Sequence, residues 1–470
     1  MTHDHRRFQR RALLAASAAG AAGWLATTGG VQASEAVSGS PSVESESAVV
    51  RWSRQVPIRY EADVAVIGGG IAGVSAACAA ARSGARVVLV ERFAVTGGDL
   101  TTGGVANFCG DTKGQGEVFD AIVADLEKFD AVAPYKAAYP EQSTRVFEHH
   151  VLAFVLQELL LRRGVKLLLH TQFVDACAND AGRITACIVC GKSGPEALQA
   201  RQFIDCTGEA DVARRAGFAV TQGRPEDGLQ LPMSIHCFVR HVEPRDAGPP
   251  LPDGWLQPIQ DRQALPMTSV WPNGPRGNSL KIKIPKFDAT DTQSLTAAEI
   301  QGRRRALEVL HYYLQVEHKP WRYDGCSPQI GIREGARVVG DYVLTVDDLR
   351  AGRAFEDGIA RGLFYLDGHK PDDEKRTYIL PTDQRKVPPY QIPLRSLLVR
   401  DGANLLAAGR CFSADQLALS SARVSTTCSM MGQAAGIAAA LAAGKHGDPR
   451  RIDAADVRRI LVERGARLEL

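Results

Sequence analysis

The sequence predicts an α/β fold with a parallel sheet at its centre and a smaller α+β region. Three observations predict it. Residues 63–90 run as an apolar strand, a glycine-rich turn, a helix and a second apolar strand. Strands that end in glycine turns recur at 203–208 and 404–410, whereas residues 215–394 hold many prolines, isolated strands and one strong helical pattern at 295–318. Strands that alternate with helices through short turns are typical of parallel sheets covered by helices.

The turn after the first strand carries glycines at G-x-G-x-x-G spacing, Gly68, Gly70 and Gly73. The first glycine permits a tight turn, the second lets backbone approach a pyrophosphate, and the third lets the helix pack closely on the strand. The helix N-terminus also offers unpaired N–H groups and a positive dipole end to phosphate oxygens. This context predicts a site for a dinucleotide that contains ADP.

The second strand of the unit, residues 86–90, ends at Glu91 and Arg92. A carboxylate at this strand end can accept hydrogen bonds from the ribose hydroxyls of an adenosine. The loop 96–104 follows and is rich in glycine, with Gly98 and Thr102 within it. Such a loop can bring backbone N–H groups to a pyrophosphate with little side-chain interference. Its position directly after the ribose acid favours a cofactor loop over a plain surface loop.

Later segments supply further parts of the same site. A helical pattern at 148–163 precedes expected strands at 165–173, 184–189 and 203–206, the last of which runs into Thr207 and Gly208. A strand and glycine turn at 404–410 lead into a small-residue helix at 425–437. A helix N-terminus there can stabilise negative charge on a reduced cofactor ring. We therefore expect the C-terminal segment to return to the N-terminal domain and close the site.

Together these pieces resemble the FAD-dependent oxidoreductase family with a glutathione-reductase-type FAD domain, near the fumarate reductase and flavin dehydrogenase branch. The matching pieces are 63–73, 91–92, 97–98, 205–211, 331–334 and 405–436. The resemblance implies a Rossmann-like FAD/NAD(P)-binding domain with a central parallel sheet, plus an α+β substrate or cap domain. It implies FAD contacts at Gly68, Gly70, Gly73, Glu91, Arg92, Gly98, Thr102, the backbone near Phe173, Thr207, Gly208, Gly409, Arg410 and Gln433.

Two departures from related groups narrow the expected chemistry. Disulfide reductases of this fold carry a cysteine pair in the loop after the ribose acid, where this chain has Asp99 to Thr102. The chain also lacks a second G-x-G-x-x-G for a nicotinamide nucleotide. We therefore expect direct hydride transfer between a small organic substrate and the flavin, with an electron acceptor that the sequence does not identify. Two alternatives stay open, an NAD-dependent dehydrogenase and a non-catalytic FAD-containing binding protein.

Charged side chains beyond the first domain are the candidates for chemistry. Hydride transfer from a C–H bond needs a base for the coupled proton and cations that hold an anionic substrate. His369, with Asp367 two residues before it, is the candidate base. Candidates for a carboxylate clamp are Arg333, Arg395 and Arg423. Two alternatives stay open here as well: an internal salt bridge between Arg333 and Glu334, and a surface-loop position for His369.

Residues 1–33 have the features of an export signal. Arg10 and Arg11 resemble a twin-arginine pair, an apolar stretch follows at 12–26, and residues 31–33 fit a small-residue cleavage site. This stretch is too short and small-sided to favour a spanning helix. The signal carries the whole formal charge of +3, so the mature chain is neutral, which argues against nucleic-acid and anionic membrane partners. We expect a periplasmic or secreted protein.

The cysteines and histidines predict neither disulfides nor a metal site. Most of the ten cysteines lie in apolar surroundings. A twin-arginine substrate is exported folded, so buried free thiols are expected. Cys187 and Cys190 fall on opposite faces of an expected strand, and His149 and His150 on different faces of an expected helix.

The expected organisation follows from these segments. It is a signal peptide (1–33), a flexible leader (34–58), the first part of the FAD-binding domain (59–214), a substrate or cap domain (215–394), the FAD-binding return segment (395–446) and a C-terminal helix (447–470).

Overall fold

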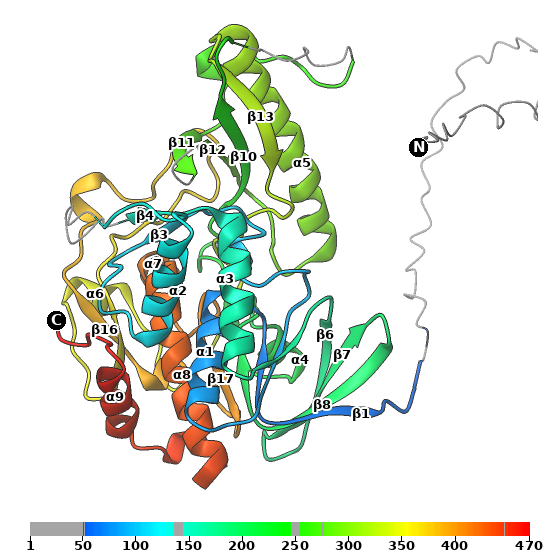
Figure 1. Ribbon diagram of the computed structural model, residues 1–470, viewed down its shortest axis with the longest axis vertical. Helices are drawn as coiled ribbons and strands as arrows, with labels where there is room; N and C mark the ends of the chain where they lie inside the picture. The colour runs from blue at the N-terminus through cyan, green and yellow to red at the C-terminus, as the bar shows by residue number, and fades with distance from the viewer. Residues whose placement is uncertain (1–49, 51, 136–143, 246–253, 274–276, 446) are drawn as a thin grey trace, which may run out of the picture. The chain divides into compact units, whose positions relative to one another are not determined.

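The computed structural model describes residues 50, 52–135, 144–245, 254–273, 277–445 and 447–470 (Figure 1). The expected signal peptide and most of the leader lie outside these residues. The chain separates into a unit Met1–Arg54 and a unit Gln55–Leu470. All the elements described below belong to the second unit.

The central sheet has the strand order β5-β2-β1-β8-β7-β6, and β17 pairs with β8 on a branch from this path. The pairs β1/β2, β1/β8, β2/β5 and β8/β17 are parallel, whereas β6/β7 and β7/β8 are antiparallel. The expected parallel sheet is therefore present, with an antiparallel extension at one side. Its strands are β1 (Ile58–Ile67), β2 (Val87–Val90), β5 (Lys166–Leu168), β6 (Gln172–Ala178), β7 (Ile184–Gly191), β8 (Gly194–Asp205) and β17 (Leu405–Ala407).

Both faces of this sheet are buried. Along β1, Val64 and Val66 join an apolar core with the helices α1 (Ile71–Arg82) and α8 (Ser425–Lys445). Ala65 and Ile67 face a second core on the other side. Because successive strand residues point to opposite faces, burial on both sides requires the near-continuous apolar run of this strand.

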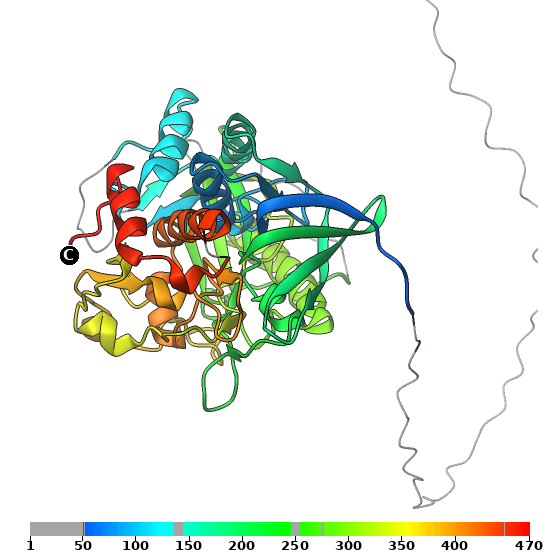
Figure 2. The ribbon, with the colours of Figure 1, turned by 90° about the horizontal axis from the view of Figure 1, so that it is seen from below.

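α1 and α8 lie side by side across one face of the sheet (Figures 1 and 2). A Cβ on Gly432 would lie 2.2 Å from the carbonyl oxygen of Ala72, and a Cβ on Gly436 would lie 2.2 Å from that of Ala76. The two backbones therefore approach more closely than any side chain at these positions allows. The Ser75 and Ser429 hydroxyls hydrogen bond at 2.8 Å across the same contact. This packing fixes the N-terminus of α8 beside the glycine-rich turn.

A second, antiparallel sheet has the order β11-β12-β10-β13. Its strands are β10 (Met233–His241), β11 (Thr268–Asn273), β12 (Gly277–Ile284) and β13 (Trp321–Cys326). The helix α5 (Thr292–His311) covers one face (Figure 1). Residues of β10 and β12 alternate between an apolar face toward α5 and a polar face on the other side. This alternation is the pattern of a sheet with two different environments.

The smaller elements connect these two sheets. Two-stranded pairs are β3 (Asn107–Cys109) with β4 (Thr144–Val146), β9 (Val220–Gln222) with β14 (Ala336–Val338), and β15 (Gly358–Gly362) with β16 (Tyr390–Pro393). The other α-helices are α2 (Glu117–Lys128), α3 (His149–Arg162), α4 (Asp211–Arg215), α6 (Val346–Arg350), α7 (Gln416–Ala422) and α9 (Ala454–Glu463). Within the described ranges, the structure contains no helix with the length and hydropathy of a membrane span.

Three local predictions are wrong in detail. The strand expected at 165–173 is split into β5 and β6 because His170 adopts a left-handed conformation, with φ of 50°, between them. The helix expected to reach His318 ends as an α-helix at His311 and continues as a π-helical turn, Tyr312–Val316. Among the ten cysteines, which are all free, Cys177 is exposed rather than buried.

Candidate active site

A cavity of about 280 Å³ opens at the carboxyl ends of β1, β2, β8 and β17. This is the edge at which open parallel sheets bind their ligands. The polar face of β10 and β12 forms part of the opposite wall through Ser234, His236 and Lys281. The cavity therefore lies between the two sheets, with one wall from each.

The geometry of the glycine-rich turn explains why each of its three motif positions is glycine. Gly68 has φ of +102°, and a Cβ there would lie 2.3 Å from the carbonyl oxygen of Cys206. A Cβ on Gly73 would lie 1.9 Å from the Gly68 carbonyl oxygen, so Gly73 serves close packing and does not line the cavity. A Cβ on Gly70 would meet no atom within 4 Å, and Gly70 lines the cavity. Only Gly70 therefore leaves space on the ligand side.

The N-terminus of α1 is open toward this space. Gly70 is its N-cap residue and provides no side-chain cap. The first N–H groups of an α-helix have no partner within the helix, and their positive dipole end favours phosphate.

Glu91 is held by its own neighbourhood before any ligand binds. It is buried, and its two carboxylate oxygens accept hydrogen bonds from the backbone N–H groups of Gly69 (2.7 Å) and Phe93 (2.9 Å). Each oxygen retains a second lone pair for a ribose hydroxyl. Arg92 also lines the cavity, and its guanidinium lies 4.8 Å from the ring centroid of Phe93.

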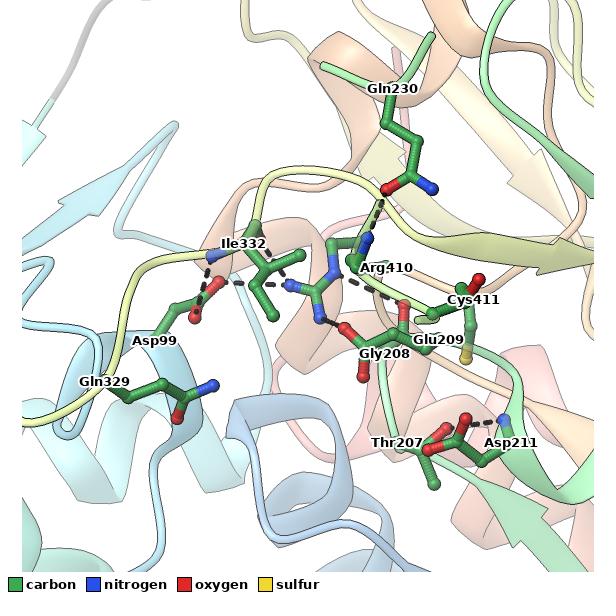
Figure 3. A network of polar contacts seen from close by, with 12 residues as sticks. Asp99, Thr207, Gly208, Glu209, Asp211, Gln230, Gln329, Ile332, Arg410 and Cys411 are labelled. Carbon is green, nitrogen blue, oxygen red and sulfur yellow. Dashed lines mark hydrogen bonds and ion pairs between the residues drawn. The ribbon is translucent and has the colours of Figure 1, made fainter. Parts of the chain in front are cut away.

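Arg410 joins four segments at the cavity wall (Figure 3). Its guanidinium donates to Asp99 at 3.2 Å, to the carbonyl oxygens of Gly208 and Ile332, and to Glu209. Burial raises the pKa of Glu209 to about 7, against the opposing charge of Arg410. Arg410 therefore connects the return segment to the loops after β2 and β8 and to the loop before β14.

One part of the cavity wall carries a cluster of cations, and we call this part the cationic pole. Lys281, Arg333 and Arg423 line it together with Asp367, and the charge of Asp99, which pairs with Arg410 in the cavity wall, also acts on Arg333. Arg333 donates to the carbonyl oxygen of Pro232 and to the Ser234 hydroxyl, both at 2.7 Å. Burial and the nearby charge of Arg423 lower the pKa of Arg333 to about 10.

Asp367 and Arg423 form an ion pair at this pole, with Arg423 Nη2 and Asp367 Oδ2 3.0 Å apart. Burial alone would raise the pKa of Asp367, but the charges and hydrogen bonds of His369 and Arg423 hold it well below its ordinary value. Asp367 is therefore a carboxylate that cancels one of the three cations. The remaining two favour a ligand with negative charge.

Lys281 is the cation at this pole with a pKa near neutral pH. Burial, followed by the charge of Arg333, lowers its pKa to about 8. Its Nζ lies 5.5 Å from the ring centroid of Trp271. Lys283 lies two residues further along β12 and also has a pKa of about 8, for the same two leading causes. Its ammonium, however, donates to the carbonyl oxygens of Asp373 and Arg376 at 2.7 Å, outside the cavity wall.

His369 does not line the cavity, and it does not lie in a surface loop. The side chain is buried, with Nε2 3.1 Å from Asp367 Oδ1 and with Nδ1 left without a hydrogen-bond partner. Burial and the charge of Arg333 lower its pKa to about 3. His369 therefore reaches the cavity wall through Asp367, to which its Nε2 is hydrogen bonded.

The structure separates the other predicted residues into two groups. The predicted cofactor contacts that lie in the cavity wall are Gly68, Gly70, Glu91, Arg92, Gly98, Phe173, Thr207, Gly208, Gly409 and Arg410. Thr102 lies outside it, where its hydroxyl bonds to the carbonyl oxygen of Gly98 and to Gln329. Gln433 also lies outside it, where its amide bonds to the backbone of Gln115 (2.7 Å) and Val118 (3.3 Å). Gln433 thus anchors α8 to the start of α2.

Two of the arginines predicted as clamp candidates lie in different environments. Glu334 pairs with Arg337 rather than with Arg333, so the structure does not support the alternative of an internal salt bridge between residues 333 and 334. Arg395 pairs with Asp357 at 3.2 Å and lies 5.0 Å from the ring centroid of Tyr342, away from the cavity. Arg395 therefore does not line the cavity, and its side chain lies in a partly exposed cluster with Asp357 and Tyr342.

Sequence reasoning missed Lys281, His236, Cys109 and Asn107, which all line the cavity. His236 is buried, hydrogen bonds through Nδ1 to the Ser279 hydroxyl at 2.9 Å, and has a pKa well below its ordinary value because of burial. Burial raises the pKa of the Cys109 thiol to about 11. The signal for the first two was present in the sequence, because polar residues alternate with apolar ones along 233–239 and 279–284.

No metal cluster occurs in the described part of the chain. His149 and His150, expected on different helix faces, have ring centroids only 3.8 Å apart, and His149 stacks on Phe238 at 4.5 Å. Burial lowers the pKa of His149 to about 4.

Comparison with known families decides the class. The FAD dependent oxidoreductase family matches residues 63–461. The chain belongs to this family. The match covers both sheets, the cavity between them and the return segment.

Several solved structures are similar at low identity. A geranylgeranyl bacteriochlorophyll reductase-like protein from Thermoplasma acidophilum shares 13% identity over 86% of this chain and 84% of its own, with a TM-score of 0.45. The flavin-dependent brominase Bmp2 shares 12% identity over 85% and 83%, with a TM-score of 0.45. The aromatic hydroxylase CabE shares 16% identity over 86% and 68%, with a TM-score of 0.43. No curated protein sequence matches the chain.

The residues present fit FAD. Gly70 leaves the space that a pyrophosphate needs beside an uncapped helix N-terminus. Glu91 is oriented for a ribose. Asn107 Oδ1 and Ser425 Oγ are buried without a partner and belong to residues of the cavity wall. Buried polar atoms of native proteins have partners, so these two atoms indicate that a polar ligand completes the wall. The protein is a FAD-dependent oxidoreductase.

Proposed function

We propose that this FAD-dependent oxidoreductase transfers a hydride between its flavin and a small organic substrate that carries a carboxylate. The observation that carries the proposal is the cationic pole, where Lys281, Arg333 and Arg423 outnumber the nearby carboxylates of Asp367 and Asp99, the second of which also pairs with Arg410. FAD, when bound, supplies the centre that accepts or donates the hydride.

Arg333 and Arg423 both have guanidinium donors that a substrate carboxylate could use. Arg333 is oriented by Pro232 and Ser234, which use one terminal nitrogen and leave the rest of its fork available. Arg423 Nε is buried without a partner although its Nη2 is bound to Asp367. A planar guanidinium with free donors matches a carboxylate in geometry and charge.

Lys281 is the residue that we assign to proton transfer. A group exchanges protons most effectively when its pKa lies near the working pH, and the pKa of Lys281 is about 8. His369 has its pKa near 3 and lies behind Asp367. We therefore assign His369 and Asp367 to positioning Arg423, and Lys281 to holding or moving the proton coupled to hydride transfer.

The experiment is anaerobic bleaching of the flavin spectrum by matched substrate pairs. Each small hydroxy or amino acid is tested beside its methyl ester, which keeps the reacting C–H bond and loses the charge. We expect bleaching by at least one free acid and a much slower reaction of its ester. Equal reaction of acid and ester across the panel would contradict the carboxylate.

Export is a separate part of the proposal. It rests on the arginine pair at Arg10 and Arg11, the apolar stretch at 12–26 and the small residues at 31–33, which all lie outside the described residues. The variant Arg10→Lys/Arg11→Lys should leave uncleaved precursor in the cytoplasm. Mass measurement of the periplasmic protein should give an N-terminus near Ser34, and a periplasmic protein with Met1 retained would contradict cleavage.

A further inference from the structure

Two cysteines are paired on adjacent strands of the second sheet. Cys237 on β10 and Cys326 at the end of β13 are directly opposite partners in the antiparallel ladder. Cys237 is fully buried among the apolar residues under α5, and Cys326 is half-buried and packs against the same core. Directly opposite residues in a ladder share a face, so both side chains lie on the α5 side of the sheet.

The ladder geometry at this pair is the one that brings side chains closest. The neighbouring pair is His236 and Ser327, and the Ser327 N–H donates to the His236 carbonyl oxygen at 2.8 Å. Hydrogen-bonded and non-hydrogen-bonded pairs alternate along an antiparallel ladder. Cys237 and Cys326 therefore form a non-hydrogen-bonded pair, for which Cα atoms are typically about 4.5 Å apart, inside the range of about 4.4–6.8 Å that disulfides use.

The local chemistry also suits oxidation. A hydrogen bond from Cys237 and a weaker one from the Tyr323 hydroxyl lower the pKa of Cys326 to about 7, with help from the charge of Arg303. The thiolate is the nucleophile in thiol–disulfide exchange, and a pKa near ambient pH is optimal for attack. Cys326 is thus the half-buried thiol that reacts first, and Cys237 is the partner beside it.

We infer that Cys237 and Cys326 form a reversible cross-strand disulfide, through exchange with a disulfide-bearing oxidant. The Cys326 thiolate attacks one sulfur of the oxidant and releases its other sulfur as a thiol. The Cys237 thiol then loses its proton and attacks Cys326, which releases the second thiol. The two cysteines lose two electrons and two protons, and the oxidant disulfide gains them as two thiols.

The bond would act on the wall of the active site. β10 carries Ser234 and His236 on its other face, and both line the FAD cavity. The next residue after Cys326 is Ser327, whose hydroxyl accepts the His236 N–H at 3.3 Å. A covalent link between these two strands therefore fixes the segment that presents His236 and Ser234, which itself holds Arg333.

The test treats the folded FAD-containing protein with excess oxidised glutathione. Free thiols are then blocked with N-ethylmaleimide in denaturant, and peptides are mapped by mass spectrometry before and after reduction. We expect a crosslinked peptide pair that contains Cys237 and Cys326. Cys190 is the internal control, because it is also half-buried but faces Gln172 and Pro195 across its ladders, and it should appear blocked or glutathionylated, never crosslinked.

A variant makes the mechanism falsifiable. In Cys237→Ala no resolving thiol is present, so glutathione should accumulate on Cys326, whereas in wild type it should not. Blocked Cys237 and Cys326 in oxidised wild type would overturn the inference. A stable glutathione adduct on wild-type Cys326 beside a free Cys237 would overturn it as well.

Discussion

The two walls of the cavity differ in whether backbone or side chains form them. The wall at the ends of β1 and β2 is made mainly of backbone: the Gly68–Gly73 turn, the uncapped N-terminus of α1 and the N–H groups that orient Glu91. The wall presented by β10, β12 and the loops at Arg333 and Asp367 is made of side chains. A backbone wall suits a group shared by every member of the family, whereas a side-chain wall can vary with the substrate.

The two walls also differ in how their charges are held. Dipoles and N–H groups of fixed backbone serve the nucleotide side. On the substrate side, burial first and the charge of a neighbouring cation second lower the pKa of Arg333 to about 10 and that of Lys281 to about 8. Substitutions on the first side should therefore abolish cofactor binding, while those on the second should leave FAD in place and change substrate binding.

The largest effect is expected at Gly70. A valine there extends into open space, so Gly70→Val should give a folded protein without FAD. Gly68→Val is the matched contrast, because its Cβ would lie 2.3 Å from a backbone oxygen at positive φ, and this protein should not fold. The visible flavin spectrum and circular dichroism of both variants measure the difference. Bound FAD in Gly70→Val would contradict the position of the pyrophosphate.

Arg333 should give the next largest effect, and Arg395 is its control. Loss of hydrogen bonds to a charged group costs roughly 1.5–3 kcal/mol, so Arg333→Met should slow flavin reduction at low substrate concentration about 10- to 100-fold. Arg395→Met removes a partly exposed pair with Asp357 and should stay within about twofold. Stopped-flow reduction under anaerobic conditions distinguishes them. Equal loss in both variants would contradict the assignment of Arg333, and not Arg395, to substrate binding.

Lys281 should make carboxylate binding depend on pH. Its pKa is about 8, so the ammonium is present below that pH and binding weakens as the pH rises through it. The other charged or titratable groups around it are Arg333, Arg423, Asp367, His236 and Cys109, and those with a shifted pKa titrate well away from pH 8.

Two lysine variants isolate this dependence. Lys281→Gln should lose the break near pH 8 in the substrate KM. Lys283→Gln should keep it, because Lys283 has the same pKa but bonds to backbone outside the cavity. A break that survives in Lys281→Gln and disappears in Lys283→Gln would reverse the assignment.

His369 should have the smallest effect of the four. It acts on the cavity only through Asp367, so His369→Gln, which keeps a hydrogen-bond donor, should slow flavin reduction less than about tenfold, below the range usual for loss of a general base. The pH profile should be unchanged. Loss of the pH dependence in this variant would restore His369 as the base.

The cofactor wall could be predicted from the sequence because its determinants are local. Gly68, Gly70, Gly73 and Glu91 fall within one strand-turn-helix-strand unit, and the turn geometry requires glycine at fixed positions. Gly73 serves close packing rather than lining, and Thr102 and Gln433 also lie outside the cavity wall. Both are polar residues near the right segments, and their hydrogen-bond partners within the protein, Gln329, Gln115 and Val118, are distant in sequence.

The substrate wall could be predicted only in part because it is assembled from distant segments. Asp367 pairs with Arg423 of the return segment, and the charge of Arg333 acts on Lys281 of β12, so each pair joins segments that are far apart in the sequence. Burial then decides the chemistry. It lowers the pKa of His369 to about 3 and that of Lys281 to about 8, and neither change is visible in a linear sequence.

The most direct test of the cationic pole needs no knowledge of the substrate. The oxidised FAD-containing protein is titrated with acetate and benzoate, and in parallel with acetamide and benzamide, while the visible flavin spectrum is followed. We expect saturable spectral shifts with the carboxylates and none with the amides, and weaker carboxylate binding in Arg333→Met but not in Arg395→Met. Carboxylates that behave like the amides, or that bind Arg333→Met as well as wild type, would contradict an anion site beside the flavin.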